Sequence, residues 1–306
     1  MIELRTLRQF IAVAEELHFS RAAQRLHMTQ PPLSVAIQAL ERELGAALFQ
    51  RTQRRVALSP AGAALLPRVR RLVAEAEALP RVAQAAAAGR AGQLRLAFVS
   101  SIAYGLLPGW LSSFRATHAD VSLQLREATL DVQLAAFDAG EIDAGFVLHA
   151  SGAAPPGFAA WAALLEPMVL ALPQAHPAAA RRRLAFAHIA AEPLLIFPRA
   201  IAPSLYDAVL GFYRAHGATP HIAQEAIQMQ TLVNLVSSGM GLAWVPASVM
   251  QLQRPGVVYR PLAGASLQCE TSLVWREHAP PVVQRFVEHV RAQQRQSPPS
   301  KNAGAR

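Results

Sequence analysis

The sequence predicts an α/β fold class, with a helical N-terminal part joined by one long helix to a larger part of mixed strands and helices. Closely spaced amphipathic helical patterns fill residues 1–45. Residues 59–89 carry one sustained apolar repeat. From Leu94 onward, strand-like and helix-like runs alternate, which is typical of parallel sheets. A chain of 306 residues with 52% hydrophobic residues has room for two or three domains with sizeable cores.

Three helices are expected in the first 45 residues. The first ends near Leu17, and Ser20 is a suitable N-cap for a short second helix over residues 21–26. Pro31 stands before a second proline, so we expect Pro31 to be the last non-helical residue and the third helix to start near Pro32. Gly45 is a good C-terminal stop for that helix. A short helix, a tight turn and a longer helix form a helix-turn-helix.

The third helix has an apolar stripe and a slim opposite face. Spacings of four, three and four residues predict a buried stripe of Leu33, Ile37, Leu40 and Leu44. The opposite face is short and neutral to basic, which suits a DNA major groove. Taken alone, this helix is better interpreted as an ordinary amphipathic surface helix.

A basic loop follows the third helix. Residues 47–50 and 56–58 read as two short strands, and Arg51, Arg54 and Arg55 lie between them. Arginines in such a wing suit phosphates or a minor groove, whereas a solvated turn is the alternative. The neighbouring helix-turn-helix favours the wing.

Residues 19–62, FSRAAQRLHMTQPPLSVAIQALERELGAALFQRTQRRVALSPAG, resemble the winged helix-turn-helix of LysR-type transcriptional regulators. The resemblance covers about the first 60 residues and implies a DNA-binding domain over residues 1–60. It implies that base edges and phosphates are met by Gln30, Pro31, Pro32, Ser34 and Gln38, and that Arg54 is the wing arginine. The family often has a long basic or polar residue after the serine. Here that residue is Val35, which can touch a thymine methyl but cannot hydrogen-bond a base.

Charge and cysteine content narrow the function classes. Residues 1–90 hold thirteen arginines and seven acidic residues, so they carry two thirds of the net charge of +9, which fits a nucleic-acid partner. The single cysteine, Cys269, excludes an internal disulfide and a multi-cysteine metal site. It lies in an expected strand, which favours a buried thiol over a redox sensor. Without a leader pattern or a membrane-length apolar run, we expect a soluble cytoplasmic protein.

Residues 61–90 are expected to form a linker helix and hinge. Ser59 is a suitable N-cap, Pro80 predicts a kink or a break, and residues 89–92 are a plausible hinge. A seam of the coiled-coil kind follows heptad spacing through Leu65, Val69, Leu72, Ala76, Leu79 and Ala83. The seam favours a dimerising helix, and packing on its own domain is the alternative. The family resemblance also implies dimers through this helix, and homotetramers.

The remaining residues, 91–306, resemble the effector-binding domain of the same family, which has a two-lobed fold like that of periplasmic binding proteins. The motifs GEIDAGF (140–146) and SSGMGLAWVPAS (237–248) carry this resemblance. We expect the chain to cross twice between the lobes. The first lobe then comprises residues 91–163 and 265–306, and the second comprises residues 164–264.

Ligands in such sheets bind at the carboxyl ends of strands, here between the lobes. Ser100, Ser101 and Thr129 each stand between a strand and a helix, where they would bind a carboxylate or simply cap the helix. Arg199 would hold a carboxylate by two hydrogen bonds, or it is a solvated loop residue. Phe197 and Pro198 would supply an apolar wall, with Phe146 either in that wall or in the core. The spacing resembles the family branch that senses benzoate- and muconate-like acids, which implies an aromatic or other small organic acid.

Enzymes and transport proteins are the rival classes. The sequence lacks the Gly-x-Ser-x-Gly, Gly-x-x-x-x-Gly-Lys and Gly-x-Gly-x-x-Gly motifs, and His176, His188, His216 and His221 have no metal-ligand spacing. A transport protein would lack the helix-turn-helix. We therefore predict no enzyme activity, cofactor or metal. The predicted protein is a LysR-type regulator that binds spaced half-sites in double-stranded promoter DNA, with binding or bending modulated by a small organic acid.

Overall fold

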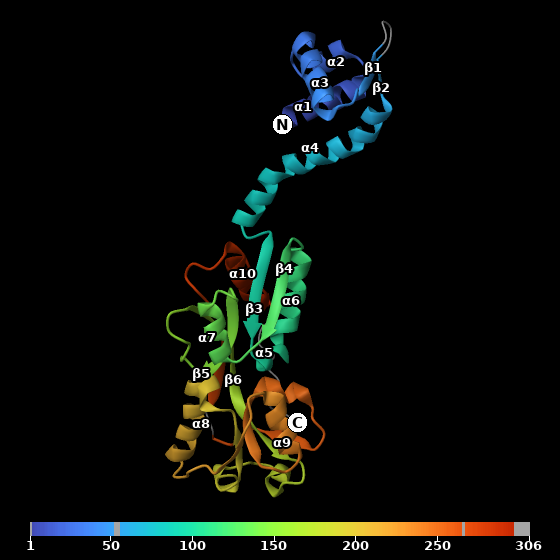
Figure 1. Ribbon diagram of the computed structural model, residues 1–306. Helices are drawn as coiled ribbons and strands as arrows, with labels where there is room; N and C mark the ends of the chain where they lie inside the picture. Colours follow the sequence, from blue (N-terminus) through green and yellow to red (C-terminus); the bar gives the residue numbers. More distant parts are fainter. Residues whose placement is uncertain (1, 52–55, 265–266, 297–306) are drawn as a thin grey trace. The chain divides into compact units, whose positions relative to one another are not determined.

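The computed structural model of the chain describes residues 2–51, 56–264 and 267–296. The chain divides into two compact units, Met1–Gln84 and Ala85–Arg306. Figure 1 shows helices and a small hairpin in the first unit, and strands covered by helices in the second. Within the described part of the chain, no helix is long and apolar enough to span a bilayer.

The N-terminal unit is a helix-turn-helix with a two-stranded wing. The hairpin is antiparallel, and Phe49 pairs with Leu58. The predicted order of three helices, two short strands and one long helix is confirmed. The elements are α1 (Leu4–Glu16), α2 (Phe19–Arg25), α3 (Gln30–Leu44), β1 (Phe49–Arg51), β2 (Val56–Leu58) and α4 (Pro60–Ala87).

Two predicted helix starts are each wrong by two residues. Helix α2 is capped by His18, whose Nδ1 accepts the Arg21 N–H at 3.3 Å, and Ser20 lies inside the helix. Helix α3 starts at Gln30, so Pro31 is helical. The first-turn N–H groups of a helix have no intrahelical acceptor, so two prolines there cost no hydrogen bond. The predicted end of α3 at Gly45 is confirmed, with φ of 66°.

Helix α3 packs on the core through Leu33, Ile37 and Leu40, all of which are buried as predicted. Leu44 is exposed instead, because the last turn extends past the core. The carboxylate of Glu41 accepts the N–H groups of Leu48 and Phe49, at 2.8 and 3.1 Å. These two bonds fasten the start of the wing to α3.

The junction between the wing and α4 is tightly packed. The Ser59 hydroxyl donates to the Ala47 carbonyl at 2.6 Å and accepts the Gly62 N–H at 3.0 Å, so the predicted cap is confirmed. A Cβ on Gly62 would lie 2.1 Å from the Leu48 carbonyl oxygen. Only glycine therefore allows this approach of α4 to the backbone before β1.

The apolar seam of α4 is divided between two environments. Val69 is buried in the core of the N-terminal unit, together with Val73. Leu72 and Leu79 are 54% and 64% exposed, and Val82 is 58% exposed. The helix runs through Pro80 without interruption, so the alternative of a break there is wrong.

The C-terminal unit has two lobes joined by two long strands. Parallel strands β4, β3 and β5 form the first lobe, and parallel strands β8, β7 and β9 form the second. Strands β6 and β11 run antiparallel to each other. β11 also pairs with β5 of the first lobe, and β6 continues into the second lobe, where it pairs with β9 and β10. The expectation of parallel sheets therefore holds for these two sets of three strands, whereas β6, β10 and β11 pair antiparallel. The strands are β3 (Gly92–Phe98), β4 (Val121–Glu127), β5 (Ala144–Ala150), β6 (Ala159–Pro173), β7 (Leu194–Ile196), β8 (Ile222–Glu225), β9 (Leu242–Pro246), β10 (Val257–Arg260) and β11 (Gln268–Trp275).

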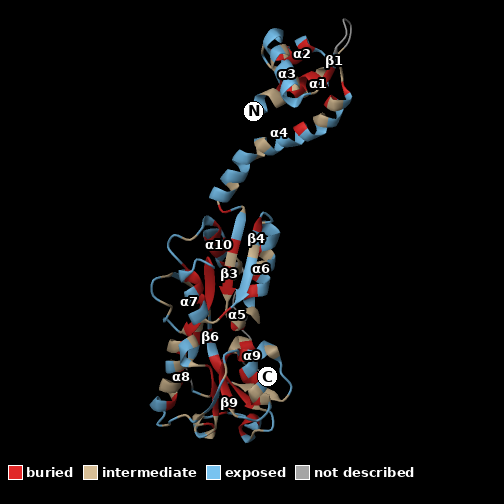
Figure 2. Cartoon of the chain, viewed as in Figure 1, coloured by how far each residue is buried: buried red, intermediate tan, exposed pale blue. Residues whose placement is uncertain are grey.

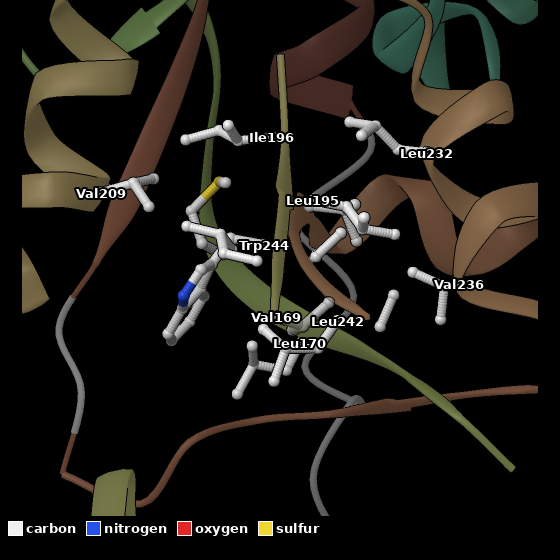
Figure 3. Close-up of a cluster of buried hydrophobic side chains, with 14 of the residues drawn as sticks. Val169, Leu170, Leu195, Ile196, Val209, Leu232, Val236, Leu242 and Trp244 are labelled. Carbon is white, nitrogen blue, oxygen red and sulfur yellow. The ribbon is translucent and has the colours of Figure 1, made fainter. Parts of the chain in front are cut away.

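Helices cover both lobes and enclose two cores. The first core centres on Phe114, Phe146 and Phe286, and the second contains Leu195, Leu242 and Trp244 (Figure 3). Figure 2 shows buried strands in each lobe. The α-helices are α5 (Ser100–Ala103), α6 (Leu106–Thr117), α7 (Leu130–Asp138), α8 (Pro203–Ala215), α9 (Met229–Ser237) and α10 (Pro281–Gln296), and 3-10 turns span Pro177–Ala180, Phe186–His188, Arg199–Ile201 and Ala247–Leu252.

A buried carboxylate lies on the crossing strand β6. Glu166 is 7% exposed, and its carboxylate accepts the N–H of Ser248 at 2.6 Å and the Ser248 hydroxyl at 3.0 Å. Burial raises the pKa of Glu166, and the bonds from Ser248 oppose that rise. Cys269 of β11 pairs with Glu166 in register and is buried, as predicted. Burial raises the pKa of its thiol far above the usual range.

Gly62→Ala is expected to lower the free energy of unfolding of the N-terminal unit by about 1–3 kcal/mol, because the new Cβ meets a backbone oxygen. Hydrogen exchange of α1 and α3 amides would measure this as faster exchange. Gly109→Ala in α6 is the control, since nothing lies within 4 Å of its Cβ and alanine favours a helix. Exchange of the α1 and α3 amides at the wild-type rate in Gly62→Ala would contradict the clash.

Glu166→Gln should stabilise the protein relative to wild type by an amount that grows with pH. The folded state holds the Glu166 proton more tightly than the unfolded state. Wild-type stability from this group therefore falls as pH rises from the unfolded pKa through the folded pKa. Urea unfolding between about pH 4 and about pH 8 tests this. The control is Glu277→Gln, at an exposed carboxylate. If the difference in unfolding free energy between Glu166→Gln and wild type stayed constant with pH, the raised pKa of Glu166 in the folded state would be refuted.

Candidate effector site and nucleic-acid interface

One face of α3 is open to solvent. Gln30, Pro31, Pro32 and Gln38 are exposed, Ser34 is half-buried, and Val35 is 61% exposed. Positions three and four apart share a helix face, so Pro31, Ser34, Val35 and Gln38 lie together. Arg51 ends strand β1, whereas Arg54 and Arg55 fall outside the described residues. The face has the width of one helix and carries no acidic side chain at these positions.

A cavity of about 40 Å³ opens in the C-terminal unit where strands of both lobes end. Such a volume holds roughly three water molecules, so a larger ligand has to move side chains or the lobes. The first lobe contributes residues 99–101, 127–129 and Leu148, and the second contributes Phe197, Ile201, Ala202 and residues 227–229. The cavity lies at the strand carboxyl ends, where the sequence analysis expects a ligand to bind.

The two serines at the end of β3 do not cap a helix. Helix α5 has Val99 at its N-cap position and no side-chain cap bond. Ser100 is half-buried and lines the cavity. Ser101 is 1% exposed and lines the cavity, and its hydroxyl oxygen lacks a hydrogen-bond partner among the described residues. A buried hydroxyl without a partner is costly and is available to a ligand.

Two longer helices begin at the cavity. Thr129 is the N-cap residue of α7 and Gln228 that of α9, and neither side chain caps its helix. The Thr129 hydroxyl donates to the carboxylate of Asp131 instead. The first backbone N–H groups of both helices therefore lack side-chain acceptors from these caps. Such helix starts favour negatively charged groups.

Glu127 is the one charged residue among those that line the cavity in the described chain. It is the last residue of β4 and is exposed to solvent. Within the described residues, its carboxylate takes part in no ion pair of 4.0 Å or less. The cavity therefore combines hydrogen-bond donors with one free carboxylate.

Arg199 and Pro198 lie outside this cavity, whereas Phe197 lines it. The Arg199 guanidinium donates two hydrogen bonds of 2.8 Å to the carboxylate of Asp207, and its side chain is 62% exposed. This pairing holds the pKa of Asp207 below its usual range. Phe146 is buried against Trp110 in the first core. Of the two predicted positions for Phe146, the core is therefore the one observed, and the wall of the ligand site is not.

Sequence reasoning missed Glu127, Ile201 and Gln228. Glu127 ends an expected strand, so the rule that selected Ser100 and Thr129 also applied to it. Gln228 follows β8, a four-residue strand that was not predicted. Ile201 enters the cavity through the 3-10 turn Arg199–Ile201, which carries no sequence signal of its own.

Comparison with known proteins assigns both units. Residues 4–63 match the family model "Bacterial regulatory helix-turn-helix protein, lysR family", and residues 87–295 match "LysR substrate binding domain". The chain is 45% identical to the HTH-type transcriptional regulator IlvR of Caulobacter vibrioides, over 92% of this chain and 95% of that protein. It is 36% identical to AlsR of Bacillus subtilis, over 96% and 97%.

A solved structure shows the same fold. The crystal structure of full-length CbnR with its target DNA is similar with a TM-score of 0.79 and 32% identity, and the match covers 95% of this chain and 99% of that one. Both curated relatives are HTH-type transcriptional regulators. The chain belongs to the LysR family of DNA-binding transcriptional regulators, with an N-terminal helix-turn-helix and a C-terminal effector-binding domain.

Proposed function

We propose that this regulator binds promoter DNA through α3 and the wing, and that a small organic acid in the cavity of the C-terminal unit modulates DNA binding or bending. The observation that carries the proposal is the cavity at the strand ends of both lobes, with polar groups and apolar side chains in its lining. A regulator of transcription must reach the chromosome, so the proposal places the protein in the cytoplasm. The domains are residues 1–60, 61–90 and 91–306, with lobes as predicted from sequence.

The DNA contacts are proposed from the open face of α3. Gln30 and Gln38 carry amides that read base edges, and Val35 contacts a thymine methyl. Pro31, Pro32 and Ser34 fit the start of the helix against the phosphate backbone. Arg51, Arg54 and Arg55 of the wing bind phosphates or enter a minor groove.

Gln30→Ala and Gln38→Ala should each weaken specific DNA binding by about 1–3 kcal/mol, or roughly 5- to 150-fold, while folding is kept. Fluorescence anisotropy on a site selected in vitro by the wild-type protein measures this. The control is Gln174→Ala, an exposed glutamine of the C-terminal unit. Unchanged affinity in both α3 variants would defeat the assigned surface.

A homodimer through α4 is the second part of the proposal. Leu72, Leu79 and Val82 are exposed apolar residues at spacings of seven and three, which suits a facing helix. Dimers would place two α3 helices in successive major grooves, with half-sites about one helical turn apart or a multiple. Pairing of dimers into tetramers would bend the DNA, as the family resemblance implies.

The effector is proposed to be a small carboxylic acid, aromatic or aliphatic. Ser101 and the starts of α7 and α9 offer hydrogen-bond donors to a carboxylate. Phe197 and Met229 offer buried apolar surface. A ligand shifts the balance between assembly geometries only through its differential affinity for them.

Acids that bind the full chain should raise its melting temperature in a concentration-dependent way, since they prefer the folded state. The same acids should change the nuclease footprint on DNA. The panel includes benzoate, muconate, amino acids and sugar acids. Footprints that stay identical with every acid that binds would count against the coupling.

A further inference from the structure

The cavity has two chemically different walls. The first lobe presents Ser101, Glu127 and Thr129 at the ends of adjacent strands, and the second lobe presents Phe197, Ile201 and Met229. Glu127 pairs in register with Phe98, three residues before Ser101. Neighbouring strands lie about 4.8 Å apart, so these polar groups share one small area. This division fits a ligand with a compact polar head and an apolar tail.

One half of the polar wall fits an anion. The Ser101 hydroxyl is buried, lines the cavity and has no partner in the described chain. The nine-residue helix α7 starts beside it with Thr129 at the N-cap, whose hydroxyl is turned to Asp131. Donors of this kind bind a carboxylate, since its two oxygens accept several hydrogen bonds.

The other half fits a cation. Glu127 lines the cavity without a partner cation, and the described lining residues include no arginine, lysine or histidine. An acid without a positive group would bring its negative charge towards the Glu127 carboxylate, with no cation to offset the repulsion. A ligand that carries an ammonium group beside its carboxylate satisfies both halves.

We propose that the effector is an α-amino acid with an apolar side chain, its ammonium on Glu127, its carboxylate at Ser101 and the start of α7, and its side chain against Phe197 and Met229. This inference rests on the proposed function of the cavity and narrows its ligand class. An α-amino acid holds both charges on one carbon, which matches two adjacent strand ends. An amino acid is larger than the cavity of about 40 Å³, so its binding requires the lining side chains or the lobes to move apart.

Calorimetry on the full-length protein tests the proposal with three matched sets of probes. The first set is L-leucine and L-phenylalanine. The second is 4-methylpentanoate and 3-phenylpropanoate, which lack the ammonium group, and the third is L-leucinamide and L-phenylalaninamide, which lack the carboxylate. We expect at least one amino acid to bind about tenfold or more tightly than both of its truncated forms, since each charge-assisted bond is lost separately.

Two variants assign the groups. Glu127→Gln should weaken amino-acid binding about tenfold or more. The difference in affinity between each amino acid and its deaminated form should become smaller. Ser101→Ala should weaken amino-acid and deaminated-acid binding alike, because both use the carboxylate. Glu277→Gln, at an exposed carboxylate outside the cavity, is the control and should change neither. These substitutions remove no partnered buried group, so melting temperatures report whether the fold is kept.

The outcomes separate this inference from the proposed function. Binding of the deaminated acids at least as tight as that of the amino acids overturns the inference and leaves an acid effector in place. Tightest binding of the amides overturns it in favour of a cation. An absence of binding by all six probes overturns both the inference and the acid site. If Glu127→Gln prefers the amino acid over its deaminated form as strongly as wild type does, the assignment of the ammonium to the Glu127 carboxylate is overturned.

Discussion

The antiparallel pairing of β6 with β11 is the constraint on which the C-terminal unit depends. Strand β11 is bonded to β5 of the first lobe along seven residue pairs and to β6 on its other side, and β6 continues past the end of β11 into the second lobe. β6 in turn holds β9 and β10. Because two strands cross, the strand ends of the two lobes face each other across one cavity. Glu166 lies at this crossing and joins β6 to the turn after β9.

In the N-terminal unit, the comparable constraint is a set of hydrogen bonds between side chains and backbone groups. Glu41 binds two N–H groups before and at β1, and Ser59 binds a carbonyl on one side and an N–H on the other. Short contacts of this type set the position of the wing relative to α3. The exposed face of α3 is thereby held in a fixed orientation relative to the wing.

Most of the fold follows from periodicity in the sequence, and the parts that do not are short. The stripe of Leu33, Ile37 and Leu40 predicted the packing of α3, and alternating runs predicted parallel strands in the C-terminal unit. The two lobes were expected from the family resemblance. Strand β8 was missed because four residues carry too little pattern, and Pro31 was misplaced because helix starts differ by one or two residues. At the candidate site, strand-end logic placed Ser101 and Thr129. It missed the partner of Arg199. Asp207 lies eight residues further along the chain in α8, and the sequence pattern does not indicate that the two side chains pair.

The single cysteine gives the protein a practical property. Cys269 is buried, and its raised pKa leaves almost no thiolate at neutral pH, so it is a poor nucleophile towards maleimides or disulfides. A cysteine introduced on either lobe would then be the one reactive thiol of the described chain. Pairs of such labels would report the distance between the lobes by fluorescence or electron spin resonance, without first removing a native residue. The buried sulfur thus makes the wild-type sequence a ready background for following motion in solution.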